Sequence, residues 1–336
     1  MNLRVALITG ASSGIGRALA IEAVKRGFVV GLMARSADGL QETVRACTEI
    51  LGDRSQSSKI HTTIGDVSIE ADCKRFVDDA MAQWGKIDVL INNAGISMRG
   101  IFEDTDISVL QRLMNTNFWG TVYCTKYALP SLLANKGSVV GISSIAGFKG
   151  LPARTGYSAS KFAMQGFLES LRCENLETGL HVLIACPGYT ESNIRKTALD
   201  ASGSQQNESP LKENKLMSAE AVAEATWNAI LGKRNYLILT LQGKMAVWIN
   251  KWFPKLADRL TYNVIKKEPN SPFKYKKVWP PAAVAAATWN AIEKRRTYLI
   301  LTLQGKMAVW INKWFPQLAD RLTYNVIKKE PNSPIK

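Results

Sequence analysis

Short apolar runs alternate with segments of helical periodicity along residues 1–240. The apolar runs are near-continuous rather than alternating, which is typical of strands in a parallel sheet covered on both faces. We predict six such strands, at 3–9, 28–34, 60–65, 89–92, 138–142 and 181–185. Between them, apolar residues recur with the helical period, and we predict helices at 14–25, 36–51, 68–84, 107–134 and 157–177.

This order predicts a doubly wound α/β fold, a Rossmann-like parallel sheet with right-handed crossovers and helices on both faces. A further helix at 218–231 and a strand at 236–241 complete a sheet of about seven strands. Ligands of such sheets bind at the carboxyl ends of the strands. The polar stretch 191–215 follows the sixth strand, and we interpret it as a mobile lid.

The C-terminal part of the chain contains a tandem repeat. Residues 221–274 recur as 283–336, offset by 62 residues without a gap and identical at 47 of 54 positions. Two near-identical copies indicate a recent duplication, or an error in the gene or its assembly, because a structural array contains several diverged copies. We therefore predict a dinucleotide-binding and catalytic domain at 1–274, a linker at 275–282, and a duplicated helix–strand–helix appendage at 283–336.

Both copies carry the same strand sequence, at 236–241 and 298–303, and one sheet edge accommodates only one of them. We favour the first copy, because Ser218 can cap its helix and the second would lengthen the connection by 62 residues. Loop entropy penalises the longer connection only mildly, so exchange of the copies stays an alternative. The unpaired copy would expose an apolar strand edge, which favours aggregation or partner binding.

A glycine-rich turn, TGASSGIG at 9–16, joins the first predicted strand to the first helix. In this context Gly10 permits a tight turn, Gly14 lets the backbone approach a phosphate, and Gly16 allows close helix packing. The helix N-terminus then faces a pyrophosphate. The turn predicts a dinucleotide site with contacts from Gly10, Ser12, Ser13, Gly14, Ile15 and Gly16.

Polar groups also follow the next three strands. Arg35 lies where an NAD site usually has a carboxylate, and its guanidinium suits the 2′-phosphate of NADP(H). Asp66 can accept a hydrogen bond from the adenine amine, and the turn 92–95, NNAG, lies along the expected path of the ribose. We predict NADP(H) as the cofactor, with contacts from Arg35, Asp66, Asn93, Ala94 and Gly95.

Tyr157 and Lys161 lie four residues apart and share one face of a predicted helix. The pKa of a tyrosine is ordinarily about 10. A neighbouring ammonium, together with the positive nicotinamide, favours the phenolate, so Tyr157 can act as a general acid or base. Ser144, on the turn after the fifth strand, can hydrogen-bond the substrate oxygen. The group predicts the transfer of a hydride and a proton.

Together these motifs resemble the short-chain dehydrogenase/reductase family over residues 1–240. The turn 9–16 is similar to the family's TGxxxGxG motif, 92–95 to its NNAG motif, and 187–188 to the PG turn after its sixth strand. The family's catalytic serine, tyrosine and lysine and its structural asparagine correspond to Ser144, Tyr157, Lys161 and Asn117.

The resemblance implies a role for each catalytic residue. Tyr157 donates a proton to a carbonyl oxygen or takes one from an alcohol, and Ser144 steadies that oxygen. Lys161 lowers the pKa of the tyrosine and holds the nicotinamide ribose, while Asn117 keeps a water between Lys161 and solvent. Ser192 stands where the family has a threonine, and its hydroxyl can make the same contact. The resemblance adds Tyr157, Lys161, Pro187, Gly188, Thr190 and Ser192 to the cofactor contacts.

The resemblance further implies the interconversion of a carbonyl and a secondary alcohol by direct hydride transfer, without a metal. The spacing of His61 and His181 fits no metal site either. The segment 92–99 and the basic, aromatic C-terminus resemble family members that act on lipophilic ketones, such as steroids or long-chain 3-oxo compounds. We predict substrate contacts from Ser97, Met98, Ser144 and Ala146.

The net charge of +15 is concentrated in the tail: residues 221–336 hold 20 basic and 6 acidic side chains, and seven of the nine tryptophans. The tail is either a helix packed over the substrate loop, which we favour for the first copy, or an interfacial element on an anionic membrane. A rival function is therefore a membrane-surface binding protein with a vestigial nucleotide site. Nonspecific binding of nucleic acid is a third interpretation, but no recognition motif predicts a specific nucleic-acid partner.

The five scattered cysteines are typical of reduced thiols in the cytosol. No apolar run approaches the ~18 residues of a spanning helix, and the N-terminus lacks the pattern of a signal peptide. We predict a cytoplasmic protein, alone or attached to a membrane face. The resemblance implies dimers through the fourth and fifth helices, and we predict a homodimer because the extra copy would obstruct a tetramer contact at the last strand.

Overall fold

The computed structural model describes residues 3–52, 58–190, 194–195, 197–206, 216–268, 271–274 and Trp289. The chain divides into two compact units, residues 1–274 and 275–336. Ser192, most of the predicted lid at 191–215 and the strand at 298–303 lie outside the described residues. The fold given below is that of the first unit.

The described strands form one seven-stranded sheet in the order β3-β2-β1-β4-β5-β6-β7, and all neighbours pair in parallel. This confirms the predicted Rossmann-like sheet, in which near-continuous apolar sequences form the strands because helices cover both faces. The strands are β1 Val5–Thr9, β2 Val29–Ala34, β3 Ile60–Ile64, β4 Val89–Asn92, β5 Ser138–Ile142, β6 His181–Cys186 and β7 Tyr236–Ile238.

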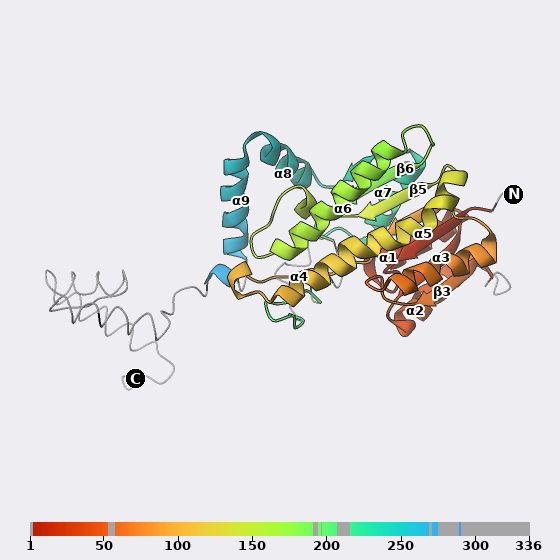
Figure 1. Ribbon diagram of the computed structural model, residues 1–336, viewed down its shortest axis with the longest axis horizontal. Coiled ribbons are helices and arrows are strands. Elements are labelled where there is room, and N and C mark those ends of the chain that lie inside the picture. Colours follow the sequence, from red (N-terminus) through yellow and green to blue (C-terminus); the bar gives the residue numbers. More distant parts are fainter. Residues whose placement is uncertain are drawn as a thin grey trace. The chain divides into compact units, whose positions relative to one another are not determined.

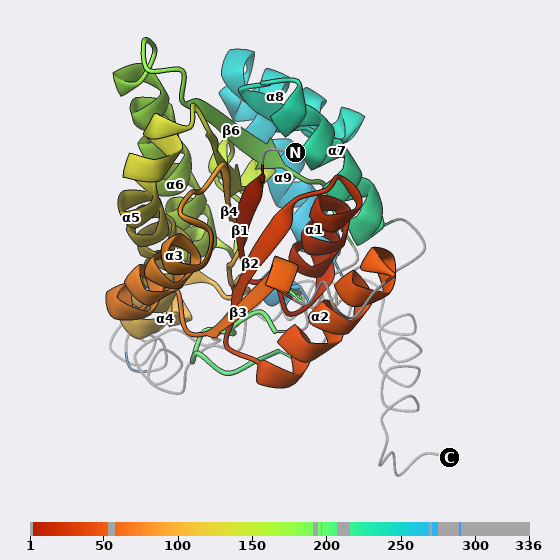
Figure 2. The same cartoon turned by 90° about the vertical axis from the view of Figure 1, so that its right-hand side faces the viewer.

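Helices cover the sheet in two layers (Figures 1 and 2). Helices α1, α2 and α7 lie on one face, and α3, α5 and α6 lie on the other. The helices are α1 Gly14–Lys25, α2 Ala37–Leu51, α3 Glu70–Trp84, α4 Ile107–Leu113, α5 Gly120–Ala134, α6 Thr155–Glu174, α7 Ala219–Leu231, α8 Leu241–Trp252 and α9 Pro254–Lys267.

The single helix predicted at 107–134 is wrong in one respect. A π-helical turn, Met114–Trp119, separates α4 from α5. Such turns are rare in proteins, and those that occur often lie at functional sites. Here the turn carries Asn117, whose side chain is fully buried and bonded to segments outside the helix.

The first copy of the repeat supplies the last strand. Ser218 caps α7, since its hydroxyl accepts a hydrogen bond from the Ala221 amide at 3.2 Å. Strand β7 then pairs with β6 and is shorter than predicted, because Thr240 already caps α8 and accepts a hydrogen bond from the Gly243 amide at 3.0 Å. Helix α9 begins at Pro254. In the first turn of a helix the missing N–H of a proline costs no helical hydrogen bond.

Trp227 on α7 anchors the first copy in the core. Its side chain is fully buried, and its indole N–H donates to the Leu19 carbonyl of α1 at 3.0 Å. Its ring lies 4.8 Å from the ring of Phe28, measured between centroids. The equivalent residue of the second copy, Trp289, has 65% of its surface exposed within the described residues. The two copies therefore place the same tryptophan in different surroundings.

All five cysteines are unpaired. No described helix combines the length and the apolar character needed to cross a lipid bilayer. The described residues also contain no cluster of three or more His, Cys, Asp or Glu side chains placed to bind a metal ion.

Candidate active site

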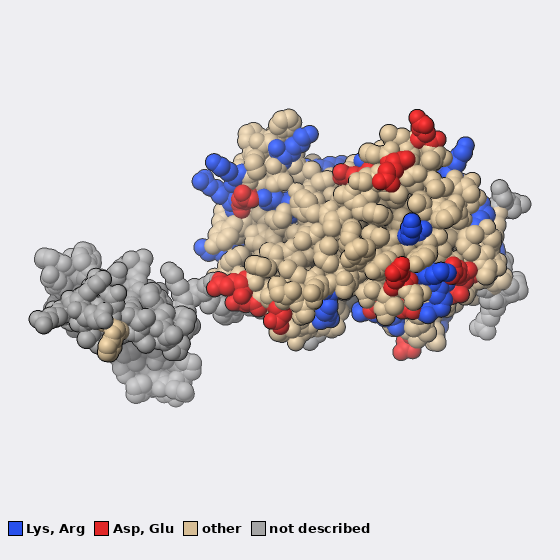
Figure 3. All heavy atoms as spheres, viewed as in Figure 1, with Lys and Arg blue, Asp and Glu red and all other residues tan. Residues whose placement is uncertain are grey.

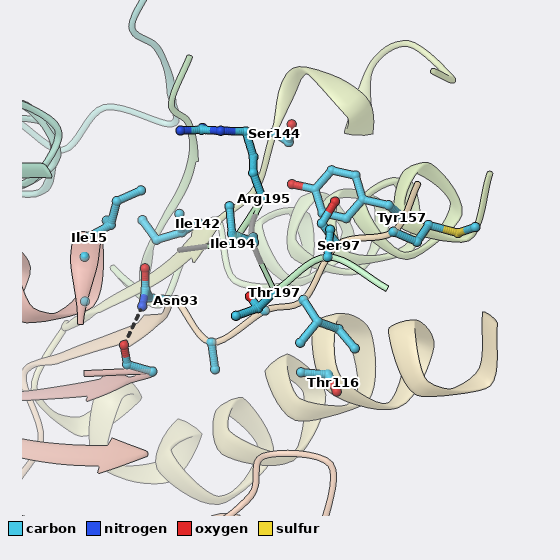
Figure 4. A pocket seen from close by; sticks show the side chains of 18 of the residues that line it. Ile15, Asn93, Ser97, Thr116, Ile142, Ser144, Tyr157, Ile194, Arg195 and Thr197 are labelled. Atoms are coloured by element: carbon cyan, nitrogen blue, oxygen red, sulfur yellow. Dashed lines mark hydrogen bonds between the residues drawn. The ribbon is translucent and has the colours of Figure 1, made fainter. Parts of the chain in front are cut away.

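A cavity of about 680 Å³ opens at the carboxyl edge of the sheet, where β1 lies between β2 and β4. Figure 4 shows residues of its wall, from Ile15 beside the glycine turn to Ser144 and Tyr157. Its lining includes these predicted site residues: Gly10, Ser12, Ser13, Gly14, Ile15, Gly16, Arg35, Asp66, Asn93, Ala94, Gly95, Ser97, Met98, Ser144, Tyr157, Lys161, Pro187, Gly188 and Thr190.

Of the predicted site residues that the structure describes, two do not line this cavity. Ala146 is fully buried and is absent from the wall, so the structure does not place it as a substrate contact. The Asn117 amide is also fully buried behind the wall. Its Oδ1 accepts from the Ile96 amide at 2.8 Å, and its Nδ2 donates to the Ile96 carbonyl at 3.0 Å and to Ser160 Oγ at 2.8 Å. The Asn117 side chain therefore positions the segment after β4 against α6.

The glycine turn requires its glycines. Gly10 and Gly14 have left-handed φ angles of +67° and +51°. A Cβ on Gly16 would lie 2.1 Å from the Gly10 carbonyl oxygen. Asn93 holds the turn, since its Nδ2 donates to the Thr9 carbonyl at 2.9 Å and to the Gly10 carbonyl at 3.2 Å. The N-terminus of α1 opens onto this turn, so the residues present fit the phosphates of a dinucleotide.

Arg35 and Asp66 lie at the same end of the cavity. The Arg35 side chain is 69% exposed, and its Nη1 lies 3.5 Å from Asp66 Oδ2. Asp66 Oδ1 accepts from the amide and the hydroxyl of Ser68 at 2.9 and 2.8 Å. The Asp66 carboxylate thus holds its own turn, while the Arg35 guanidinium extends toward solvent and remains accessible to a ligand.

Ser144, Tyr157 and Lys161 come together at the ends of β5 and α6. The Tyr157 phenol lies beside Ser144, whose hydroxyl accepts a hydrogen bond from the Ala146 amide at 3.1 Å. Lys161 Nζ donates to the Ile142 carbonyl at 2.9 Å and lies 5.9 Å from the centroid of the Tyr157 ring. Figure 4 shows the Tyr157 phenol projecting into the cavity beside Ser144 and Ser97.

Burial controls the protonation of this group. Burial raises the pKa of the Tyr157 phenol, and the neighbouring Ser144 hydroxyl and the charge of Arg154 only partly oppose that rise. Burial lowers the pKa of Lys161 to about 8, which still leaves the amine protonated at neutral pH. The sequence predicts that Lys161 lowers the pKa of Tyr157. In the protein without a cofactor the pKa of Tyr157 is instead raised, because the effect of burial is larger than that of the neighbouring charges.

Four arginines of the cavity wall were missed from the sequence: Arg99, Arg112, Arg154 and Arg195. Arg99 ends the segment 92–99, whose sequence indicates the substrate class without indicating a role for this residue, and the other three belong to no recognisable motif. The one local signal is that Arg154 precedes the helix that carries Tyr157 by a single residue. Its proximity to the phenol is visible only in the folded protein, where its charge lowers the pKa of Tyr157.

Comparison with known proteins agrees with this geometry. The family model for short chain dehydrogenases matches residues 4–202. The chain belongs to the short-chain dehydrogenase/reductase family. Members of this family bind NAD(P)(H) and act on CH–OH groups, so the protein is an oxidoreductase that interconverts a carbonyl and an alcohol.

Two relatives match most of this short-chain dehydrogenase/reductase. The 11-beta-hydroxysteroid dehydrogenase-like 4A of Arabidopsis thaliana is 37% identical over 257 residues, which cover 76% of this chain and 83% of the relative. The dehydrogenase/reductase SDR family member 7B of Xenopus tropicalis is 34% identical over 266 residues, covering 79% and 86%.

Solved structures agree on the fold. A short-chain dehydrogenase from Streptomyces avermitilis is 27% identical, with a TM-score of 0.65 and coverage of 79% of this chain and 98% of that chain. An alcohol dehydrogenase from Thermococcus sibiricus complexed with 5-hydroxy-NADP is 23% identical, with a TM-score of 0.60 and coverage of 70% and 94%. At that identity the second match shows the fold alone.

Proposed function

We propose that this protein is an NADP(H)-dependent oxidoreductase that interconverts a lipophilic or 3-oxo carbonyl compound and its secondary alcohol. The observation that carries the proposal is a single cavity lined by both the glycine turn and the group of Ser144, Tyr157 and Lys161. The printed names of the relatives, which include 11-beta-hydroxysteroid dehydrogenases, favour a lipophilic substrate.

Residues of the cavity have distinct roles in the proposed reaction. A nicotinamide cofactor held by the glycine turn would supply the hydride for reduction, or accept it in the reverse reaction. The phenol of Tyr157, whose pKa burial raises, stays protonated at neutral pH and donates its proton to the carbonyl oxygen during reduction. Ser144 binds the same oxygen, and Lys161, protonated below a pKa of about 8, adds positive charge beneath the phenol.

Consumption of NADPH in the presence of a panel of steroids and long-chain 3-oxo compounds tests this function. We expect turnover of at least one lipophilic ketone. Absence of turnover with any carbonyl compound, by folded protein that binds NADPH, contradicts the proposed activity and favours a vestigial nucleotide site.

Arg35 is the residue that we propose selects NADP(H) over NAD(H). Its exposed guanidinium lies after β2, where it can make charge-assisted hydrogen bonds with a 2′-phosphate. We expect Arg35→Asp to weaken NADPH binding by about 10- to 100-fold, the loss typical of one hydrogen bond to a charged group, and to strengthen NADH binding. Fluorescence titration of both cofactors measures this.

The matched control for the cofactor titration is Arg45→Asp. Arg45 is an exposed residue of α2 that does not line the cavity, so this substitution should leave both affinities unchanged. Equal weakening of NADPH and NADH binding by Arg35→Asp contradicts the selective role.

A second function, contact with an anionic membrane surface, is favoured by helices α8 and α9. On α8, Leu241, Met245, Trp248 and Trp252 recur at helical spacing, and each exposes more than half of its surface. Residues 241–267 hold six basic side chains and one acidic side chain. Figure 3 shows Lys and Arg side chains gathered over this part of the molecule. Exposed aromatic residues beside lysines are typical of interfacial helices.

Sedimentation with vesicles tests this contact. We expect W248E/W252E to reduce binding to phosphatidylserine vesicles strongly, because each change removes an apolar anchor and adds a negative charge. The matched control is W310E/W314E, which alters the equivalent positions of the second copy, and a chain ending at Lys274 isolates the first unit. Equal binding of wild type and W248E/W252E contradicts a role for α8. We also propose a homodimer formed through the fourth and fifth predicted helices, which correspond to α4 with α5 and to α6. A tetrameric mass in solution would contradict it.

A further inference from the structure

Positive charge dominates the wall of the cavity. Its described lining residues include one acidic side chain, Asp66, and six cationic ones: Arg35, Arg99, Arg112, Arg154, Lys161 and Arg195. Asp66 lies beside Arg35, at 3.5 Å, where the cofactor adenosine is expected. The other described lining residues, including those near Tyr157, contain no acidic side chain.

Arg154 is the most unusual of these cations. Its side chain is only 11% exposed, and its Nη2 lies 3.8 Å from Glu268 Oε1, beyond hydrogen-bond distance. Within the described part of the chain its guanidinium makes no hydrogen bond. A buried guanidinium is unfavourable unless it is paired and hydrogen-bonded. Its planar set of donors, on the wall of the cavity, is therefore suited to a ligand that brings negative charge.

Glu268 lies beside both Arg99 and Arg154. This residue follows α9, is 6% exposed, and accepts a hydrogen bond from Arg99 Nη2 at 3.1 Å. The Gly100 amide donates to the Ala153 carbonyl at 2.9 Å, which holds the segments of Arg99 and Arg154 together. Glu268 thus lies between two buried guanidiniums, and it is hydrogen-bonded to that of Arg99 but not to that of Arg154.

The backbone before Arg154 is strained. Ala153 has a φ of +60° and is 5% exposed. This left-handed conformation is unfavourable for a residue with a Cβ and, where it persists, is often found at functional sites. Here it turns the chain immediately before Arg154, so that the arginine enters the wall next to the helix that carries Tyr157.

We propose that Arg154, with Arg99 beside it, binds an anionic group of the substrate, a carboxylate or a phosphate, while Tyr157 acts on the carbonyl. This inference rests on the proposed oxidoreductase function and narrows its substrate class. Met98 and Leu199, both buried and on the same wall, supply apolar surface. The substrate is therefore a ketone that joins an apolar chain to an anionic head group.

Matched pairs of neutral and charged ketones test the subsite. The probes are 5-oxohexanoate and 9-oxodecanoate, each with its methyl ester, and 2-oxopropylphosphonate with its dimethyl ester. With NADPH, we expect kcat/KM for the charged member of the best pair to exceed that of its ester by about 10- to 100-fold, as for a charge-assisted hydrogen bond. The carboxylate and phosphonate pairs distinguish the two head groups.

Variants of Arg154 test whether this residue causes the preference for charged over neutral ketones. Arg154→Gln should bring the ratio of charged to neutral substrate close to one, whereas Arg154→Lys should retain part of it because the charge remains. Arg172→Gln, on the same helix and outside the cavity lining, should keep the wild-type ratio. Equal kcat/KM for acid and ester in the wild type, or an unchanged ratio in Arg154→Gln, overturns the proposal.

A binding measurement separates this subsite from the proposed catalytic function. Isothermal titration of the Tyr157→Phe variant with bound NADP⁺ compares the acids and the phosphonate with their esters without requiring turnover. Tighter binding of a charged member, lost in Tyr157→Phe/Arg154→Gln, supports the subsite even if no probe is reduced. Equal binding of charged and neutral members overturns it, whereas reduction without any charge preference leaves the oxidoreductase function intact.

Discussion

Tyr157→Phe is expected to lower kcat for ketone reduction by roughly 100- to 10,000-fold, the usual contribution of a positioned general acid. The phenol lies beside Ser144 in the cavity, and burial keeps it protonated, so removal of its hydroxyl removes the proton donor. NADPH affinity should change little, because the glycine turn and Arg35 remain. Stopped-flow reduction of a saturating ketone and a fluorescence titration of NADPH measure the two quantities separately.

Tyr262→Phe is the control for this change. Tyr262 is an exposed residue of α9 outside the cavity lining, and loss of its hydroxyl should leave turnover at the wild-type rate. If Tyr157→Phe retained most of its activity, or lost activity only in proportion to NADPH affinity, the phenol would not be the proton donor.

Trp227→Ala is expected to lower the free energy of unfolding by about 3–5 kcal/mol, the usual cost of truncating a buried tryptophan to alanine. The substitution leaves a cavity between α7 and α1, removes the contact with Phe28, and leaves the Leu19 carbonyl without its indole donor. Urea unfolding followed by circular dichroism measures the loss.

The duplicated sequence provides the control. Trp289 occupies the equivalent position of the second copy, and its side chain is 65% exposed, so Trp289→Ala should change the free energy of unfolding by less than about 0.5 kcal/mol. Equal destabilisation by both substitutions would mean that the two copies exchange places on the sheet edge, the alternative that the sequence leaves open.

The sheet was predictable because its strands are encoded locally. The boundaries of 89–92 and 138–142 agree with β4 and β5, since each is a short apolar run in a sheet covered on both faces. The interruption between α4 and α5 was not predictable. It accompanies contacts of Asn117 with Ile96 and Ser160, which lie far from it in the sequence.

The candidate site also combines features that local sequence patterns predict with features that depend on distant contacts. The glycine turn and the Tyr157–Lys161 spacing are local patterns, and the structure brings both to one cavity. The exclusion of Ala146 from the wall depends on tertiary packing. The pairing of Arg99 with Glu268 joins residues 169 positions apart, so no local sequence pattern predicts it. Sequence motifs therefore indicate the chemistry of the site, but they do not indicate the arginines in the cavity wall.

Glu268 has a consequence for the order in which the protein matures. Translation proceeds from the N-terminus, and early segments start to fold before later ones exist. The glycine turn, Ser144 and Tyr157 all leave the ribosome long before this carboxylate, which follows α9. Until then, the guanidiniums of Arg99 and Arg154 lack this counter-ion, so these two residues of the cavity wall gain it only after nearly all of the first unit has been synthesised.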